Sequence, residues 1–351
     1  PDMVKLVAPG EITFFFVAIV AFNALVGWVT SPETMANCSA GKTEMEGRVG
    51  VTVGMFGKRI CTVAWMLTGL CAIVMYDKLD DVDLAYGNMA RDLLGGIAPG
   101  LIGLFIACML ASVMSTCDSL MVVASALFTE NLYKKFVAPG QPDKHYTLIG
   151  RIASGAVVVL GIYVAFNLES VVKGLEFYWM LSALMGIAFW AGLFWRRATS
   201  AGAWAATLVS LGVFVLTSAK PLGIPWDFNA HFADKLPAFM VWDGKLSVPW
   251  QMILYLSAGF VVLVVVSLCT RRTPTERLDR LYTCLRTPIG PDEPETEALT
   301  LPAGVQPGLR NVLVKHPDFE IPKPTVVGVA GFAAAWVGVA VLIGVVYWII
   351  G

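Results

Sequence analysis

Four hydroxyl side chains and one acid lie in the middle of an apolar stretch that runs from Gly100 to Tyr133. The hydroxyls recur at i, i+3, i+4 and i+7, which places them on one face of a helix: Ser112, Ser115, Thr116 and Ser119. Asp118 adjoins that face. A carboxylate at bilayer depth costs about 2.5–3.5 kcal/mol, so a membrane helix keeps one mainly where it meets a partner or an ion. Because hydroxyl and carboxylate oxygens are ligands for hard cations, the pattern predicts an ion site.

A simpler interpretation of the hydroxyls stays open. Serine and threonine in membrane helices often donate to the carbonyl four residues earlier, which would account for one or two of them. Four hydroxyls on one stripe, together with an acid, favour the ion site over this local hydrogen bonding.

The elements that must position these residues are membrane helices. Of the 351 residues, 57% are hydrophobic and 15% are charged, against about 25% charged in soluble domains. We therefore predict an all-α polytopic membrane protein that forms a single transmembrane domain in the lipid bilayer. About eight runs approach the length needed to cross it: 11–29, 59–76, 99–128, 149–166, 175–195, 201–218, 250–269 and 326–350. The net charge of −1 gives no basic field for nucleic acid.

Basic residues orient these spans. Of the 25 Lys and Arg residues, 18 lie in alternate polar segments: 30–59, 131–151, 196–197 and 271–325. The positive-inside rule places these segments, including the long segment 271–325 between the last two spans, in the cytoplasm. Both ends of the chain are then expected on the outer side of the plasma membrane. In segment 271–325, Leu278, Leu281, Tyr282 and Leu285 share one helical face, which favours a helix lying on the inner leaflet.

The first span contains possible helix breakers. Asn23, Gly27 and Pro32 lie within or just after it. Interrupted helices line substrate cavities in transporters, although glycine also serves close packing between ordinary membrane helices. No phosphate-binding loop, zinc-protease motif or serine-hydrolase elbow occurs, and the seven cysteines have neither zinc-site nor disulfide-framework spacing. We expect the cysteines to be free, buried thiols. We also expect that the protein has no cofactor and is not an enzyme.

Three stretches resemble the sodium/solute symporter family, which includes sodium-coupled sugar, proline, pantothenate and sialic acid carriers. GLIGLFIACMLASVMSTCDSLMVVASALFTENLY is similar to the family's eighth core helix. AFWAGLFWRRATSAGAWAA, from Ala188 to Ala206, resembles the family signature GLFWxRxTxxGA near the tenth core helix. The run from Trp28 to Lys42 resembles the end of the sixth.

The resemblance implies a five-plus-five inverted-repeat transporter fold, of which this chain supplies the second half. Its spans correspond to core helices six to ten and three trailing helices. The chain begins at Pro1, so we expect helices one to five in the missing N-terminal part of the same chain or in a companion chain. The family's sodium site shares ligands between helices one and eight, and this chain would carry half of that site.

The resemblance also implies roles for individual residues. Ser115 and Thr116 match the family's sodium-coordinating hydroxyl pair, and Ser112 matches a position that offers its backbone carbonyl. Asp118 and Ser119 match positions that line a second cation site in some members. The substrate pocket would draw on the sixth and tenth helices, around these residues: Asn23, Gly27, Trp28, Glu176 and Tyr178. Gly27 stands where the sugar carriers have an aromatic gate, which disfavours a sugar as the solute.

Two functional hypotheses follow. The first is sodium-coupled symport of a small organic solute by alternating access, with Na+ as the coupling ion. The second is a sensory or regulatory membrane module that uses the same fold without transport.

Overall fold

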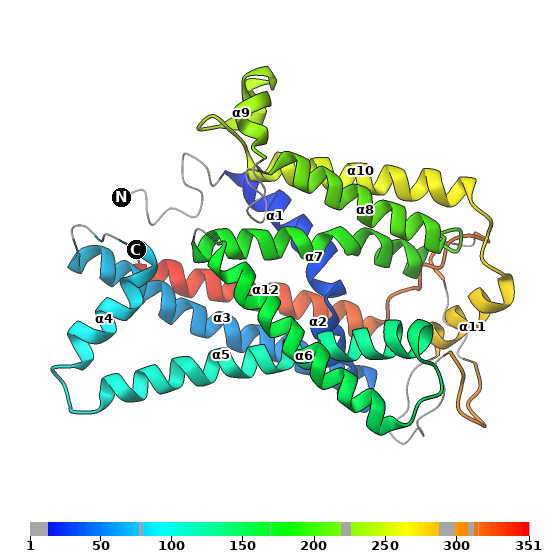
Figure 1. Cartoon of the computed structure of the whole chain (residues 1–351), viewed down its shortest axis with the longest axis horizontal. Coiled ribbons are helices and arrows are strands. Elements are labelled where there is room, and N and C mark those ends of the chain that lie inside the picture. Colours follow the sequence, from blue (N-terminus) through cyan, green and yellow to red (C-terminus); the bar gives the residue numbers. More distant parts are fainter. Residues whose placement is uncertain are drawn as a thin grey trace. The chain divides into compact units, whose positions relative to one another are not determined.

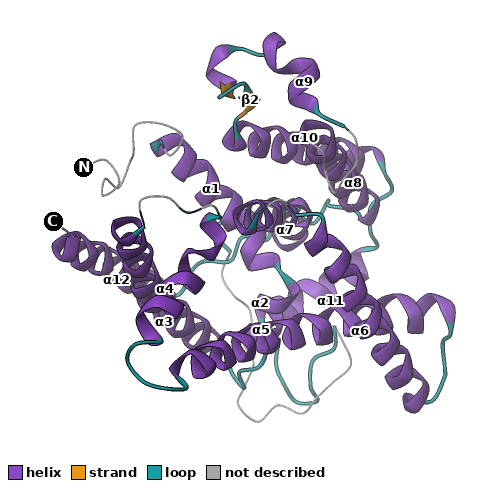
Figure 2. Cartoon of the chain, turned by 60° about the vertical axis from the view of Figure 1, so that its left-hand side comes forward, coloured by secondary structure: helices purple, strands orange, loops and turns teal. Residues whose placement is uncertain are grey.

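The computed structural model describes residues 13–76, 79, 81–168, 170–218, 226–287, 299–307, 312–314 and 316–350. Helices make up almost all of its regular structure (Figure 2). Seven of the described helices are long and apolar enough to cross a membrane, or eight if one bent pair near the start counts as a span. The chain is therefore an all-α polytopic membrane protein.

A helix lies over each of the eight apolar ranges. They are α1 (Phe14–Gly27), α3 (Glu44–Met75), α5 (Leu101–Ala126), α6 (Asp143–Phe166), α7 (Val171–Phe194), α8 (Ser200–Thr217), α10 (Val248–Cys269) and α12 (Val326–Ile350). The ends differ most for α3, which begins well before the apolar run at residue 59. Backbone hydrogen bonding continues through the polar residues that precede the run, so hydropathy marks only the part of the helix suited to lipid.

Shorter elements connect these helices. They are η2 (Trp28–Thr30), α2 (Pro32–Ser39), η3 (Val82–Leu84), α4 (Ala85–Leu94), η4 (Leu127–Val137), α9 (Phe228–Phe232), η6 (Ala233–Lys235), η7 (Ala238–Met240), β1 (Val241–Trp242), β2 (Lys245–Leu246) and α11 (Thr275–Arg286). The antiparallel hairpin of β1 and β2 turns at Asp243 and Gly244, which both have positive φ. Two such residues in succession are typical of the tight turn whose twist matches that of paired strands.

The chain forms two compact units. The first contains Pro1–Thr52 and Leu175–Gly351, and the second contains Val53–Gly174, so the boundary falls inside α3. The first unit holds the main hydrophobic core, which α7, α8 and α10 build together. Figure 1 shows α8 and α10 side by side. The buried core side chains are Met180, Ala183, Leu184, Ile187, Ala206, Phe214, Met252, Tyr255, Leu256 and Leu263.

The second unit is organised by α5 and α6. Gly100, with φ +89°, precedes α5 in a left-handed conformation that suits glycine. After Ala126 the helix continues as η4, a π-helical segment of 11 residues. The end of this segment contacts the start of α6, where the Tyr133 hydroxyl lies 3.0 Å from Nε2 of His145. This contact fixes the junction between the two helices.

Helix α11 differs from its sequence-based expectation. Leu278 and Tyr282 are buried against the rest of the first unit, although Leu285 on the same apolar face is exposed. The protein itself thus covers much of the face that was expected to meet the inner leaflet. The cysteines also differ from expectation: all seven are free thiols, but six are exposed, because their helices present them outside the packed core.

Candidate functional site

The oxygen-bearing residues of α5 form a continuous stripe along that helix. All five predicted residues are exposed in the structure. The Thr116 hydroxyl lies 3.2 Å from the carbonyl oxygen of Ser112, and the Ser119 hydroxyl lies 3.2 Å from that of Ser115. The structure thus brings together the Ser112 carbonyl and the Thr116 hydroxyl, two of the three oxygens assigned to sodium.

These contacts are also the local hydrogen bonds that the simpler interpretation predicts. They account for two hydroxyls, those of Thr116 and Ser119. A hydroxyl that donates its proton to a carbonyl keeps its oxygen lone pairs, so it can still coordinate a cation. Local hydrogen bonding and ion coordination are therefore compatible on this stripe.

The first span is interrupted as its sequence predicts. Helix α1 and η2 end at Thr30, and α2 begins at Pro32 with its axis turned by 57°. The Thr30 hydroxyl donates to the Gly27 carbonyl at 2.7 Å, and the Ser31 side chain caps the start of α2 by accepting from the Thr34 backbone N–H. Proline at the first helical position lacks an N–H that the helix would leave unpaired. The break thus places the C-terminal end of one helix next to the N-terminus of another, and the Gly27 and Trp28 carbonyls at this end accept hydrogen bonds from Thr30 and Ser31.

Asn23 lies deeper in α1 and is almost completely buried. Its amide nitrogen donates to the carbonyl of Trp179 on α7 at 3.0 Å, and its amide oxygen accepts from the Tyr255 hydroxyl of α10 at 2.5 Å. A buried amide with both ends paired joins three helices. In this structure Asn23 therefore performs a packing role that its assignment to the substrate pocket did not include.

Of the other four predicted substrate residues, Gly27 lies where α1 meets α7, Trp28 begins η2, and Glu176 and Tyr178 lie on α7. A Cβ added to Gly27 would lie 2.7 Å from the backbone nitrogen of Ala183, so the two helices cross there at close range. Glycine at this position has a packing reason in addition to any role in a pocket. Trp28 and Glu176 are half-buried, and Tyr178 is 41% exposed.

Sequence reasoning gave no role to Glu33, the acid in the first turn of α2. Its carboxylate acts electrostatically on Tyr178, and it is half-buried just beyond the helix break. The signal that could have indicated it is an acid directly after the proline that restarts the helix. The substrate candidates and Glu33 belong to the first unit, and the sodium candidates belong to the second.

The signature-like stretch near the end of α7 forms a helix corner. Arg197 donates to the carbonyls of Leu268 and Thr270, each at 3.0 Å, at the C-terminal end of α10. A cation is favoured there because the carbonyls at a helix C-terminus are unpaired and carry partial negative charge. Thr199 caps the start of α8, and its hydroxyl lies 2.8 Å from that of Thr270. The motif thus joins α8 to α10.

Comparisons with known proteins agree with this architecture. The model of the sodium:solute symporter family matches residues 2–210. The chain is 34% identical over 144 residues to the sodium/proline symporter of Haemophilus influenzae, covering 40% of this chain and 28% of that protein. It is 27% identical over 222 residues to the high-affinity proline transporter PutP of Bacillus subtilis, covering 62% and 46%.

A third relative is the sodium/pantothenate symporter of Haemophilus influenzae, 25% identical over 236 residues, which are 66% of this chain and 47% of that protein. The matches thus span from about a quarter to about half of the length of these relatives. By name the relatives are symporters and transporters, not enzymes. Since the family model matches more than half of the residues, the chain belongs to the sodium:solute symporter family.

Proposed function

We propose that the protein to which this chain belongs is a secondary transporter that couples the inward flow of Na+ to the uptake of a small organic solute by alternating access. The observation that carries this proposal is the oxygen stripe of α5 within an apolar span of the symporter family. Such a stripe is costly in a bilayer unless it serves an ion or a polar partner.

In this proposal Na+ binds the Ser112 carbonyl and the hydroxyls of Ser115 and Thr116. Three neutral oxygens are too few for a hard cation, which takes six or more in comparable calcium sites. The remaining ligands would come from the family's first core helix, in the N-terminal part of the protein or in a companion chain. Asp118 and Ser119 would contribute to a second cation site beside the first.

The solute would bind at the break between η2 and α2. Unwound backbone and a helix N-terminus offer both acceptors and donors to a polar solute, as at the midplane sites of other transporters. Gly27, Trp28, Glu176 and Tyr178 would surround it, while Asn23 holds α1 in place against α7 and α10. Glu33 adds a carboxylate to this site, which favours a solute that carries a positive charge or several hydrogen-bond donors.

The proposed location is the plasma membrane, with several spans and both ends of this chain outside. The distribution of Lys and Arg supports this orientation.

The test is uptake by the full-length protein, reconstituted in proteoliposomes with an inward Na+ gradient. Labelled proline, pantothenate and glucose form the first panel, because relatives are named for these solutes. We expect uptake of at least one small solute with Na+, and none with a K+ gradient of equal size. Solute binding without uptake in either gradient would contradict the proposal and would favour the sensory alternative.

A further inference from the structure

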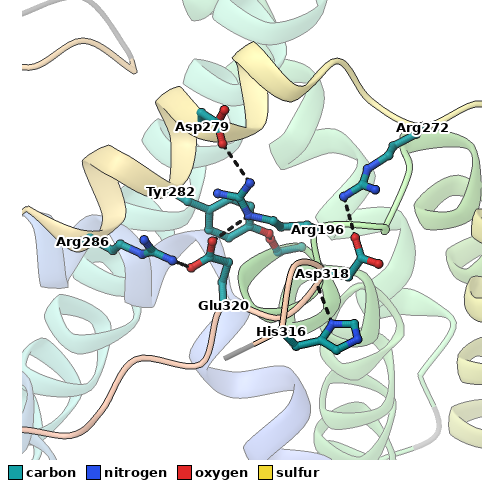
Figure 3. A network of polar contacts seen from close by, with 9 residues as sticks. Arg196, Arg272, Asp279, Tyr282, Arg286, His316, Asp318 and Glu320 are labelled. Carbon is teal, nitrogen blue, oxygen red and sulfur yellow. Dashed lines mark hydrogen bonds and ion pairs between the residues drawn. The ribbon is translucent and has the colours of Figure 1, made fainter. Parts of the chain in front are cut away.

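The family signature GLFWxRxTxxGA specifies no residue type at the position of Arg196. In this structure Arg196 is the centre of a polar cluster at the end of α7 (Figure 3). Its Nε donates to the Glu320 carboxylate at 2.6 Å, and one terminal nitrogen donates to Asp279 of α11 at 2.8 Å. The other oxygen of Glu320 pairs with Arg286, also from α11. Glu320 thus lies between two guanidinium groups, and we call these four residues together with Tyr282 the clasp.

Tyr282 adds an uncharged connection within the clasp. Its hydroxyl donates to the Gly192 carbonyl in the last turns of α7 at 2.7 Å, and the Arg196 guanidinium lies 5.0 Å from the centre of its ring. The ring therefore packs under the arginine that Glu320 and Asp279 hold. Tyr282 thus makes a hydrogen bond to Gly192 and a cation–π contact with Arg196, and together these contacts hold α11 against the end of α7.

Residues 316–320 form a segment that we call the strap. Its backbone pairs with the residues at the end of α7. The Arg196 N–H donates to the Asp318 carbonyl at 2.8 Å, and the Glu320 N–H donates to the Phe194 carbonyl at 2.9 Å. These two bonds flank an antiparallel bridge between Trp195 and Phe319. The strap thereby satisfies a carbonyl that the end of a helix would leave unpaired. Arg272 also pairs with Asp318, at 2.5 Å.

Burial makes the register of the strap specific. The side chain of Glu320 is 7% exposed and that of Arg196 is 17% exposed. A carboxylate in such a place is costly without its partners, and removing one partner of a buried pair costs more than the intact pair contributes. In the observed register of the strap, Glu320 pairs with both arginines. The backbone bridge and the side-chain pairs therefore depend on one another.

We propose that the clasp joins α11 and the strap permanently to the end of α7, so that these three elements move as one body. In this proposal Glu320 is the positioning residue that holds the end of α7 in its place against the strap and α11. The effect of the clasp on transport rests on the proposed function, because α7 carries the substrate candidates Glu176 and Tyr178. The segment before the last span is then a working part of the moving body and not a detached tail.

A reversible cross-link tests whether the clasp stays closed. Trp195 and Phe319 form a non-hydrogen-bonded antiparallel pair, whose Cα atoms lie about 4.5 Å apart in such ladders, within the range for a disulfide. In the full-length protein with its native cysteines replaced, Trp195→Cys with Phe319→Cys should form a disulfide under mild oxidant. Sodium-driven uptake should be the same before and after reduction.

Loss of uptake on oxidation that is restored by reductant would overturn the proposal, since it would mean that the clasp opens during transport. Failure of the disulfide to form at all would also contradict it, because the bridge would then be absent from the native protein. Cross-linking is read on gels and requires no transport. A protein that cross-links but takes up no solute in any variant would therefore count against the proposed function and leave the clasp supported.

A second experiment tests Glu320 itself. Cys284 on α11 is half-buried and serves as the single reporter thiol when the other cysteines are replaced. In Glu320→Gln we expect several-fold faster labelling of Cys284 by maleimide and a several-fold lower maximal uptake, with the half-saturating Na+ concentration unchanged. Glu320→Asp should restore part of both. Glu276→Gln, at an exposed acid on the same helix, is the matched control and should match the parent protein. Unchanged labelling and uptake in Glu320→Gln would overturn the positioning role.

Discussion

Gly202 of α8 and Ser267 of α10 face each other so closely that a Cβ on the glycine would overlap the serine hydroxyl. The relationship recurs with the residue types exchanged, because a Cβ on Gly259 of α10 would overlap the hydroxyl of Ser210 on α8. Each serine also makes a hydrogen bond across the junction: Ser210 donates to the Tyr255 carbonyl at 3.0 Å, and Ser267 accepts from the Thr199 N–H at 3.2 Å. Small residues let two backbones approach, and hydroxyls connect them.

The first prediction concerns this junction. Gly259→Ala should destabilise the protein by about 1–3 kcal/mol, the usual cost of overpacking, because Ser210 cannot withdraw while it donates to Tyr255. Thermal unfolding in detergent measures the effect. Gly212→Ala is the control in α8, since a Cβ there meets no atom within 4 Å. Adding Ser210→Gly to Gly259→Ala should recover part of the loss, and no recovery would show that the overlap is not the cause.

The second prediction concerns the sodium candidates. Thr116→Val and Ser115→Ala each remove one hydroxyl oxygen while α5 stays intact. Both should raise the Na+ concentration needed for half-maximal uptake, with a smaller effect on solute binding at saturating Na+. Ser125→Ala is a control on the same helix, because its hydroxyl donates only to the local Val122 carbonyl. Unchanged sodium dependence in both Thr116→Val and Ser115→Ala would remove these hydroxyls from the site.

The sequence predicted the helices well because membrane helices are selected by length and apolarity, and both can be counted. It also indicated a break near Pro32, because proline restricts the residue before it and favours the first turn of a new helix. It did not predict the partners of Asn23 or Arg196. Those partners, Tyr255 and Glu320, are 232 and 124 residues away along the chain, and local periodicity carries no information about such pairs.

The site was predicted unevenly for the same reason. The stripe of α5 depends on spacing within one helix, so its oxygens could be grouped from the sequence. The substrate candidates depend on which faces of α1 and α7 meet, and that depends on Gly27 packing against Ala183. Glu33 was missed because its relevance comes from Tyr178, which lies on another helix. Roles of individual residues came from the resemblance to the family, and only at positions that match its motifs. Periodicity alone could not assign them.

The third prediction is the orientation of the chain in the membrane. Ala303→Cys lies in segment 271–325, which is predicted to face the cytoplasm. Gly96→Cys lies in segment 77–98, which the same rule predicts to face outward. Both positions are exposed in the structure. In a background without other cysteines, an impermeant maleimide added to intact cells should label Gly96→Cys alone. Strong labelling of Ala303→Cys before the cells are opened would reverse the assignment.

The fourth prediction is a dependence on alkaline pH through Tyr282. Burial raises the pKa of its phenol, and the Arg196 guanidinium opposes part of that rise. In the unfolded chain the phenol ionises near pH 10, so above about that pH the unfolded state binds fewer protons than the folded state and this tyrosine's contribution to stability declines. Below that pH the contribution is complete.

Thermal unfolding measured from pH 8 to 11 tests this sign. Tyr282→Phe should lower stability at pH 8, because the hydrogen bond to the Gly192 carbonyl is lost, and the difference from the parent protein should narrow above about pH 10. A constant difference across the whole range would show that Tyr282 ionises no differently in the two states.

The last prediction concerns Asp118, whose structural and functional roles lead to opposite results. Its carboxylate lies on α5 beside Ser115, within the exposed stripe. If the acid only stabilises packing, Asp118→Asn should preserve transport, because the amide has a similar shape and hydrogen-bonding capacity. If the acid binds a cation, the charge itself is required, since Ser112, Ser115 and Thr116 already supply neutral oxygens. We expect the second result: Asp118→Asn loses sodium-driven uptake, while Asp118→Glu, which keeps the charge, retains part of it. Uptake measured across pH in both variants distinguishes the roles, and coupling equal to the parent protein in Asp118→Asn at every pH would assign Asp118 to packing.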